Sequence, residues 1–223
     1  MEIFGKDERH RLAETQVERD LGIQLSDDLK WHTQAVTAAN KANSVLGMLK
    51  RTFVYWNEDM SKQLYVTFVR PHLEYAAPAW NPYRRGDEKL LENIQRRATK
   101  MAPSLKNVSY KERLKKLGLT TLTERRERGD AIQYFKIDKG LNLVKYIEPN
   151  RLASSINSTG PAANIRGHAH RLERQAVKGC DQREFFFSNR MVPIWNLLPE
   201  EIVNAKTTNE FKNLFDKFKK EKG

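Results

Sequence analysis

Apolar residues recur at spacings of three and four along much of this chain, and this periodicity restricts the possible folds more than any other feature. The first such run consists of Val36, Ala39, Ala42, Leu46, Leu49 and Phe53. An α-helix has about 3.6 residues per turn, so this spacing places these side chains on one face. The sequence therefore predicts a helix after Asp28 that buries this face in a core.

A second helix is expected after Asn57, because asparagine is a favoured residue at helix N-termini. Its apolar face would consist of Met60, Leu64 and Phe68. Pro71 lacks a backbone N–H and its ring clashes with the preceding turn. We therefore expect Pro71 to end or kink this helix.

Two capping boxes indicate helix starts further along the chain. Thr121 is followed by Glu124 at the required spacing, and Thr207 is followed by Glu210. Gly129 lies inside the first of these helices and costs about 1 kcal/mol relative to alanine, which argues against an unbroken helix. The apolar face of the last helix would consist of Phe211, Leu214, Phe215 and Phe218.

The beginning of the chain has the pattern of short strands. MEIF is a brief apolar run, and Leu21, Ile23 and Leu25 in RDLGIQLS alternate with period two. Residues 149–184 contain several Pro and Gly with little periodicity, which indicates an irregular loop. We therefore predict a mainly α fold: a helical bundle with a short β element at the N-terminus and a helical C-terminal region.

The chain is strongly basic, with a formal net charge of +12 and a pI near 9.7. Residues 84–128 alone contain fourteen Lys or Arg against six Asp or Glu, a net charge of +8. Residues 1–30 have a net charge of −3, from five Lys or Arg and eight Asp or Glu. Such an uneven distribution favours a polyanionic partner, most often a nucleic acid.

A helix expected over residues 87–101 would place much of this positive charge on one side of the helix. Leu91, Ile94, Ala98 and Met101 fall on one side at 100° per residue. Basic residues on the other side and just before the helix form the candidate site, which we call the basic face: Arg84, Arg85, Lys89, Arg96, Arg97 and Lys100. Guanidinium and ammonium groups there could contact a phosphate backbone. A merely solvated helix face has the same pattern, so both interpretations stay open.

Aromatic residues near the ends of these helices could stack on bases. They are Tyr55, Trp56, Trp80 and Tyr83. Aromatic residues at helix ends are nevertheless more often part of the core. His32, beside Trp31, is expected to pack at the start of the first helix.

The sequence contains no convincing pattern for a catalytic site or a metal site. Asp27 and Asp28 could hold Mg²⁺ for phosphoryl transfer, but no good third carboxylate precedes them, and we interpret Ser26–Asp28 as a turn that caps the next helix. His168, His170 and Cys180 lack the spacing of a zinc site. No cofactor is expected in this chain.

The compartment expected is intracellular, nuclear or cytoplasmic. The single cysteine, Cys180, cannot form an intrachain disulfide, which suits a reducing compartment. The N-terminal segment MEIFGKDERHR lacks the apolar run of a secretory signal. No run approaches the roughly 20 apolar residues that span a bilayer, so neither secretion nor a membrane partner is expected.

Several segments resemble reverse transcriptases of jockey-like and chicken-repeat-type non-LTR retrotransposons. They are RDLGIQLSDDLKWHTQAVTAANKANSVLGMLKR, FVRPHLEYAAPAWNPYRRGDEKLLENIQRRATK, LTTLTERRERGDAIQYFKI, IRGHAHRL and FFFSNRMVPIWNLLPEEIVNAKTTNEFKNLFDKF. They occur in the order of the family and span roughly residues 17–220. VRPHLEY, QRRATK and WNLLP together are highly specific.

The resemblance implies a domain organisation and a function. Residues 1–28 would be a remnant of the palm strands, residues 29–103 a thumb-like helical domain, and residues 104–223 a helical C-terminal region. The thumb would grip an RNA or RNA–DNA template–primer duplex through backbone phosphates. The aspartates and Mg²⁺ of the parent RNA-directed DNA polymerase would lie upstream, so this chain alone is expected to be inactive. A domesticated RNA-binding or adaptor protein, or a non-functional remnant, are the alternatives.

Overall fold

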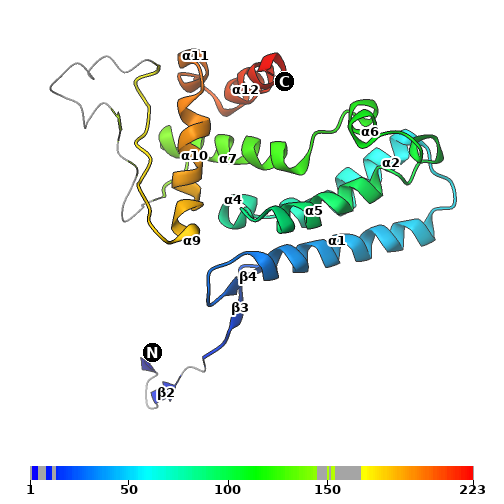
Figure 1. The fold of residues 1–223 in the computed structure, drawn as a ribbon, viewed down its shortest axis with the longest axis horizontal. Helices are drawn as coiled ribbons and strands as arrows, with labels where there is room; N and C mark the ends of the chain where they lie inside the picture. Colours follow the sequence, from blue (N-terminus) through cyan, green and yellow to red (C-terminus); the bar gives the residue numbers. More distant parts are fainter. Residues whose placement is uncertain are drawn as a thin grey trace.

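A computed structural model describes residues 2–4, 9–11, 14–144, 150, 152–153 and 167–222. The described part is mainly helical, with two short antiparallel strand pairs near the N-terminus (Figure 1). Helix α1 lies beside α5, α7 continues above α5, and α10 crosses α7 at the end that also holds α11 and α12 (Figure 1). The predicted fold class is confirmed.

The strands form two separate hairpin-like pairs. Strand β1 (Glu2–Phe4) pairs with β2 (Arg9–Arg11), and β3 (Val17–Asp20) pairs with β4 (Ile23–Ser26). Leu21 and Gly22 connect β3 to β4 with φ of 45° and 85°, the positive values of a type I′ turn. The predicted single alternation through Leu21 is therefore wrong, because the chain reverses at this residue.

Helix α1 (His32–Thr52) buries Gln34, Ala35, Ala38, Ala39, Ala42, Leu46 and Leu49. Its N-cap is Trp31, and no side chain caps this end. The predicted cap by Ser26–Asp28 is wrong: Asp28 instead accepts the backbone N–H of Lys30 at 3.0 Å and pairs with its ammonium at 2.7 Å. The aspartate is thus used in a local turn that ends before the helix begins.

The second helix contains a change of register. Helix α2 (Glu58–Leu64) is capped by Asn57, which accepts the N–H of Met60 at 2.8 Å, as predicted. A π-helical segment (Tyr65–Val69) then leads into α3 (Arg70–Glu74), with Pro71 in its first turn. The buried residues Ser61, Tyr65, Val69 and Leu73 follow one another at spacings of four, and the π turn keeps this row facing the core.

The expected apolar face of that helix is therefore wrong in its second half. Phe68 is 49% exposed, because the row that faces the core runs through Tyr65 and Val69, one residue further along than predicted. The N–H of Arg70 bonds to the carbonyl of Tyr65, five residues earlier. Pro71 lies in the first turn of α3, directly after the π segment, and the helical path continues through it.

A first core forms where α1, the π segment, α3, α4 (Ala77–Trp80) and α5 (Arg85–Ala98) meet. Its largest member is Trp80, which is fully buried and donates from Nε1 to the carbonyl of Tyr75 at 2.6 Å. The 3-10 turn Pro103–Leu105 and α6 (Tyr110–Leu117) follow α5 and bury Ala102, Leu105 and Leu117 in a small satellite cluster.

Helix α7 (Leu122–Asp138) connects this core to a second one. Leu122 belongs to the first core, while Ala131 and Phe135 belong to the second. Thr121 and Glu124 form the predicted capping box. The helix continues without a break through Gly129, because burial at both ends outweighs the low helix propensity of one glycine.

The second core gathers α10 (Phe187–Asn196), α11 (Glu200–Val203) and α12 (Thr208–Lys222) around α7, and the short helix α9 (Asp181–Glu184) precedes α10 and contacts it. Its aromatic centre consists of Phe135, Trp195, Phe211 and Phe215. Thr207 caps α12 by accepting the N–H of Glu210 at 3.1 Å, and the carboxylate of Glu210 accepts the N–H of Lys206. The predicted apolar face of this helix is confirmed.

The irregular loop expected over residues 149–184 falls partly outside the described residues, namely at 149, 151 and 154–166. The described part contains a single antiparallel bridge between Leu152 and Leu172 and the short helix α9. Asn196 exchanges two hydrogen bonds with the backbone of Leu172, at 2.9 and 2.8 Å. These contacts hold this part of the segment against α10.

Candidate nucleic-acid interface

The rotation of α5 about its axis is fixed by its buried face. Leu91, Ile94 and Ala98 are 0–2% exposed and pack in the first core, as predicted. Gln95 is also fully buried: its amide donates to Tyr110 Oη at 2.8 Å and to the carbonyl of Thr120 at 3.0 Å. The opposite face of α5 is therefore directed away from the core.

All six residues of the basic face are exposed. Arg85, Lys89, Arg96 and Lys100 follow spacings of four, seven and four, which place them along one line on α5 and the turn after it. Arg97 is rotated to the side of this line, and Arg84 is the N-cap residue. The fourteen residues of α5 extend over roughly 21 Å, about the axial rise of six base pairs.

Arg96 has a specific contact within the protein. Its guanidinium carbon lies 4.0 Å from the ring centroid of Tyr110, a cation–π geometry. The hydroxyl of Tyr110 donates to Glu92, and burial, followed by this hydrogen bond, raises the pKa of Tyr110 well above its usual value. The contact joins α5 to α6, so Arg96 is partly a structural residue.

The other five cations of the basic face form no ion pair within the described residues. Arg84 and Arg85 lie at the positive end of the α5 dipole, where cations disfavour the helix. Arg84 and Arg85 therefore do not stabilise α5 through its dipole. Asp87 and Glu88 in the same turn supply the favourable charge.

Four exposed lysines near α6 extend the set of available cations, and the sequence reasoning missed them. They are Lys106, Lys111, Lys115 and Lys116. The available signal was the capping box of Ser109 and Glu112, which predicts a helix with Lys111 and Lys115 one turn apart. The Arg96–Tyr110 contact places this helix next to α5.

Several cations of the same basic segment have structural roles instead. Arg113 is buried and donates to Thr99 Oγ1 and to the carbonyl of Val108. Arg125 pairs with Glu74, Arg128 pairs with Asp216, and Arg126 is buried. The net charge of this segment therefore overstates the charge that a partner could contact.

Three of the four candidate stacking aromatics are used in packing. Trp80 is in the core, Trp56 packs edge-on against Phe53, and Tyr83 stacks on Phe185 with ring centroids 4.7 Å apart. Tyr55 is 74% exposed and is the one of the four that could stack on a base. Base stacking is therefore a minor feature of this surface.

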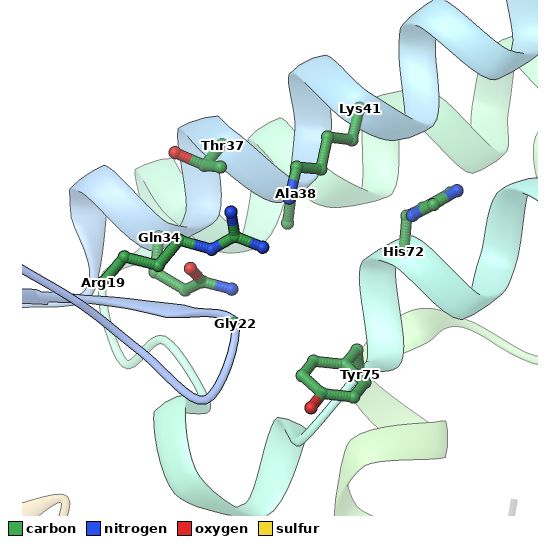
Figure 2. A pocket seen from close by; sticks show the side chains of 8 residues that line it. All are labelled: Arg19, Gly22, Gln34, Thr37, Ala38, Lys41, His72 and Tyr75. Atoms are coloured by element: carbon green, nitrogen blue, oxygen red, sulfur yellow. The ribbon is translucent and has the colours of Figure 1, made fainter.

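A separate cavity of about 260 Å³ lies between the β3–β4 turn, α1 and α3 (Figure 2). Its walls are formed by Arg19, Gly22, Gln34, Thr37, Ala38, Lys41, His72 and Tyr75. The hydroxyl of Tyr75 donates to the carbonyl of Leu21 at 3.0 Å and so attaches the hairpin turn to the end of α3. The sequence reasoning did not find this site, because its residues come from three separate segments.

The residues weighed as metal ligands lie in other arrangements. His168 is buried and bonds through Nε2 to the carbonyl of Trp195 at 3.0 Å, while His170 contacts Asp138 at 3.3 Å. Cys180 is exposed. Across the part of the chain that the structure describes, no three His, Cys, Asp or Glu side chains come together as a metal site.

His32 was expected to pack at the start of the first helix, but it lies at the surface there. Its side chain is 65% exposed and its Nδ1 lies 2.6 Å from the buried carboxylate of Asp87, so it joins the starts of α1 and α5 from the surface. Trp31 packs against the first core.

No helix among the described residues is long and apolar enough to cross a membrane. Nothing matches this chain in comparisons with protein-family models, with curated proteins and with solved structures. The basic face of α5 and the cavity beside the β3–β4 turn are the two surface features that could bind a partner.

Proposed function

We propose that this chain binds the phosphate backbone of a nucleic-acid duplex through the basic face of α5. The observation that supports this proposal best is that all six cations are exposed, and that five of them form no ion pair within the described residues, on a helix whose other face is fully buried. Because no acidic side chain among the described residues pairs with these five cations, they are available to contact the phosphates of a partner. Binding to phosphates would release condensed counterions, which is the main driving force of such contacts.

A template–primer duplex is the nucleic acid that we propose, because the segments described above resemble the thumb of non-LTR reverse transcriptases. A thumb needs contacts that do not depend on sequence, and phosphate contacts have this property. Nucleotidyl transfer is not assigned to Asp27 and Asp28, since the Asp28 carboxylate is engaged by Lys30. The proposed activity of this chain is binding.

The proposal is tested with a triple variant, Lys89→Gln, Arg97→Gln and Lys100→Gln. Arg96 is left in place because it stacks on Tyr110. The affinity for an RNA–DNA duplex, measured by fluorescence anisotropy between about 50 and 200 mM salt, should fall, and the slope of log K against log salt should lessen by up to about 3. The melting temperature should hardly change, because exposed substitutions usually cost within about 0.5 kcal/mol each.

A matched control removes three exposed lysines elsewhere: Lys206→Gln, Lys217→Gln and Lys220→Gln, in and just before α12. This variant has the same net charge and should retain most of the wild-type affinity. Equal losses in the two variants would mean that net charge and not the basic face determines binding. A duplex-binding constant that does not depend on salt would mean that the contacts are not made to phosphates.

A further inference from the structure

Three basic side chains from different elements meet at the cavity beside the β3–β4 turn. Arg19 extends from β3, Lys41 from α1 and His72 from α3 (Figure 2). None of the eight residues that line the cavity is acidic. None of the three basic side chains forms an ion pair within the described residues.

Gln34 adds an oriented donor to this cavity. It is buried, and its Oε1 accepts the backbone N–H of Gln24 at 2.9 Å. This bond fixes which end of the amide faces β4, so the NH₂ group is directed away from β4, beside the Arg19 guanidinium (Figure 2). The two N–H groups have no acceptor among the described residues, and they are available to a ligand in the cavity.

The acidic neighbours of Arg19 do not neutralise the cavity. Glu18 and Asp20 flank it on β3, and side chains alternate between the two faces of a strand, so both are directed to the other face. Glu18 accepts a hydrogen bond from Thr15. The charged side chains that line the cavity are therefore all basic, in a volume suited to one small anionic group.

We propose that this cavity binds a single phosphate group, with Arg19 and Gln34 as hydrogen-bond donors and Lys41 and His72 as further cationic or donor groups. A guanidinium fork matches two phosphate oxygens, and an ammonium contributes a point charge. That the phosphate belongs to a nucleic acid rests on the proposed function. It would be either the terminal phosphate of a strand or an internal diester.

The test uses the full chain and two short single-stranded oligonucleotides of one sequence, with a 5′-phosphate or a 5′-hydroxyl. Affinities are measured for the wild type, for a cavity variant (Arg19→Gln, Lys41→Gln) and for a control of equal charge on α12 (Lys217→Gln, Lys220→Gln). The wild type and the control should bind the 5′-phosphate about tenfold more tightly, as expected for charge-assisted hydrogen bonds. The cavity variant should bind both oligonucleotides equally.

If the wild type does not distinguish the two oligonucleotides, but the cavity variant loses more affinity for both than the control does, the bound phosphate is an internal diester. If the cavity variant and the control behave alike with both, the proposal is overturned. Circular dichroism verifies that both variants fold.

Failure of the proposed function has a different signature. The α5 triple variant would then bind like wild type, while the preference for a 5′-phosphate would persist. If no oligonucleotide binds, inorganic phosphate serves as the probe, compared with chloride at equal ionic strength. A larger rise in melting temperature for the wild type than for the cavity variant supports the site, and an equal rise overturns it.

Discussion

Three arginines near the start of α7 show how much the surroundings of one residue type can differ. Arg125 forms a two-pronged contact with Glu74, which raises its pKa, and Arg128 forms a similar contact with Asp216. Arg126, between them, is 3% exposed, and its Nε and Nη2 have no hydrogen-bond partner among the described residues. Burial lowers the pKa of Arg126.

Replacing Arg126 by methionine should therefore raise the stability of the protein or leave it unchanged. The methionine keeps most of the buried volume and removes two unsatisfied donors, each of which costs about 1–3 kcal/mol when buried without a partner. Urea unfolding of wild type and Arg126→Met measures the difference. A loss of more than about 1 kcal/mol would show that bridging water or the nearby Glu92 compensates the charge.

At the scale of elements, α7 is a continuous helix that contains a destabilising glycine in its interior. Gly129 lies in its middle, and a Cβ built at this position meets no other atom within 4 Å. Alanine loses less backbone entropy than glycine on helix formation.

Gly129→Ala should therefore stabilise the protein by about 0.5–1 kcal/mol. The melting temperature by calorimetry is the measurement. Gly118→Ala is the contrast, since this glycine ends α6 with a φ of 59° and a Cβ there would lie 3.3 Å from Lys62 Nζ. That variant should be less stable than wild type, and a gain in both variants would contradict the conformational explanation.

At the scale of the whole molecule, the two cores are joined by a buried ion pair as well as by α7. Arg190 on α10 donates to both oxygens of Asp130 on α7, at 2.9 and 3.1 Å, and to the carbonyl of Pro78 on α4 at 2.6 Å. Asn81 donates to the same carboxylate at 3.2 Å. Burial raises the pKa of Asp130, against the opposing effect of its hydrogen bond to Arg190.

Asp130→Asn should destabilise the protein by up to about 3–5 kcal/mol, because the Arg190 guanidinium, which is only 12% exposed, loses its counter-charge, and this loss outweighs the relief of burying one carboxylate less. The Arg128–Asp216 pair is the control: it links α7 to α12 with similar geometry, but its side chains are 35% and 42% exposed. Asp216→Asn should cost at most about 1 kcal/mol. Similar losses from the two substitutions in denaturant unfolding would mean that burial does not set the strength of these pairs.

The sequence by itself determined which faces of the long helices are buried. The positions of Leu91 and Ile94 on α5, and of Phe211 and Phe215 on α12, follow from a period of 3.6 residues, which is a local property. The cap at Asn57 and the capping box at Thr121 were also predictable, because each involves residues three positions apart. The outward direction of the basic face followed from the same periodicity.

The tertiary structure decided which polar groups find partners, because those partners lie far away in the sequence. Arg96 stacks on Tyr110, whereas Lys89 and Arg97 on the same helix have no ion pair among the described residues, and no local pattern distinguishes them. The register shift that exposes Phe68 depends on how the π segment packs against α1 and α5. The cavity containing Arg19 exists only because three separate segments fold together around it.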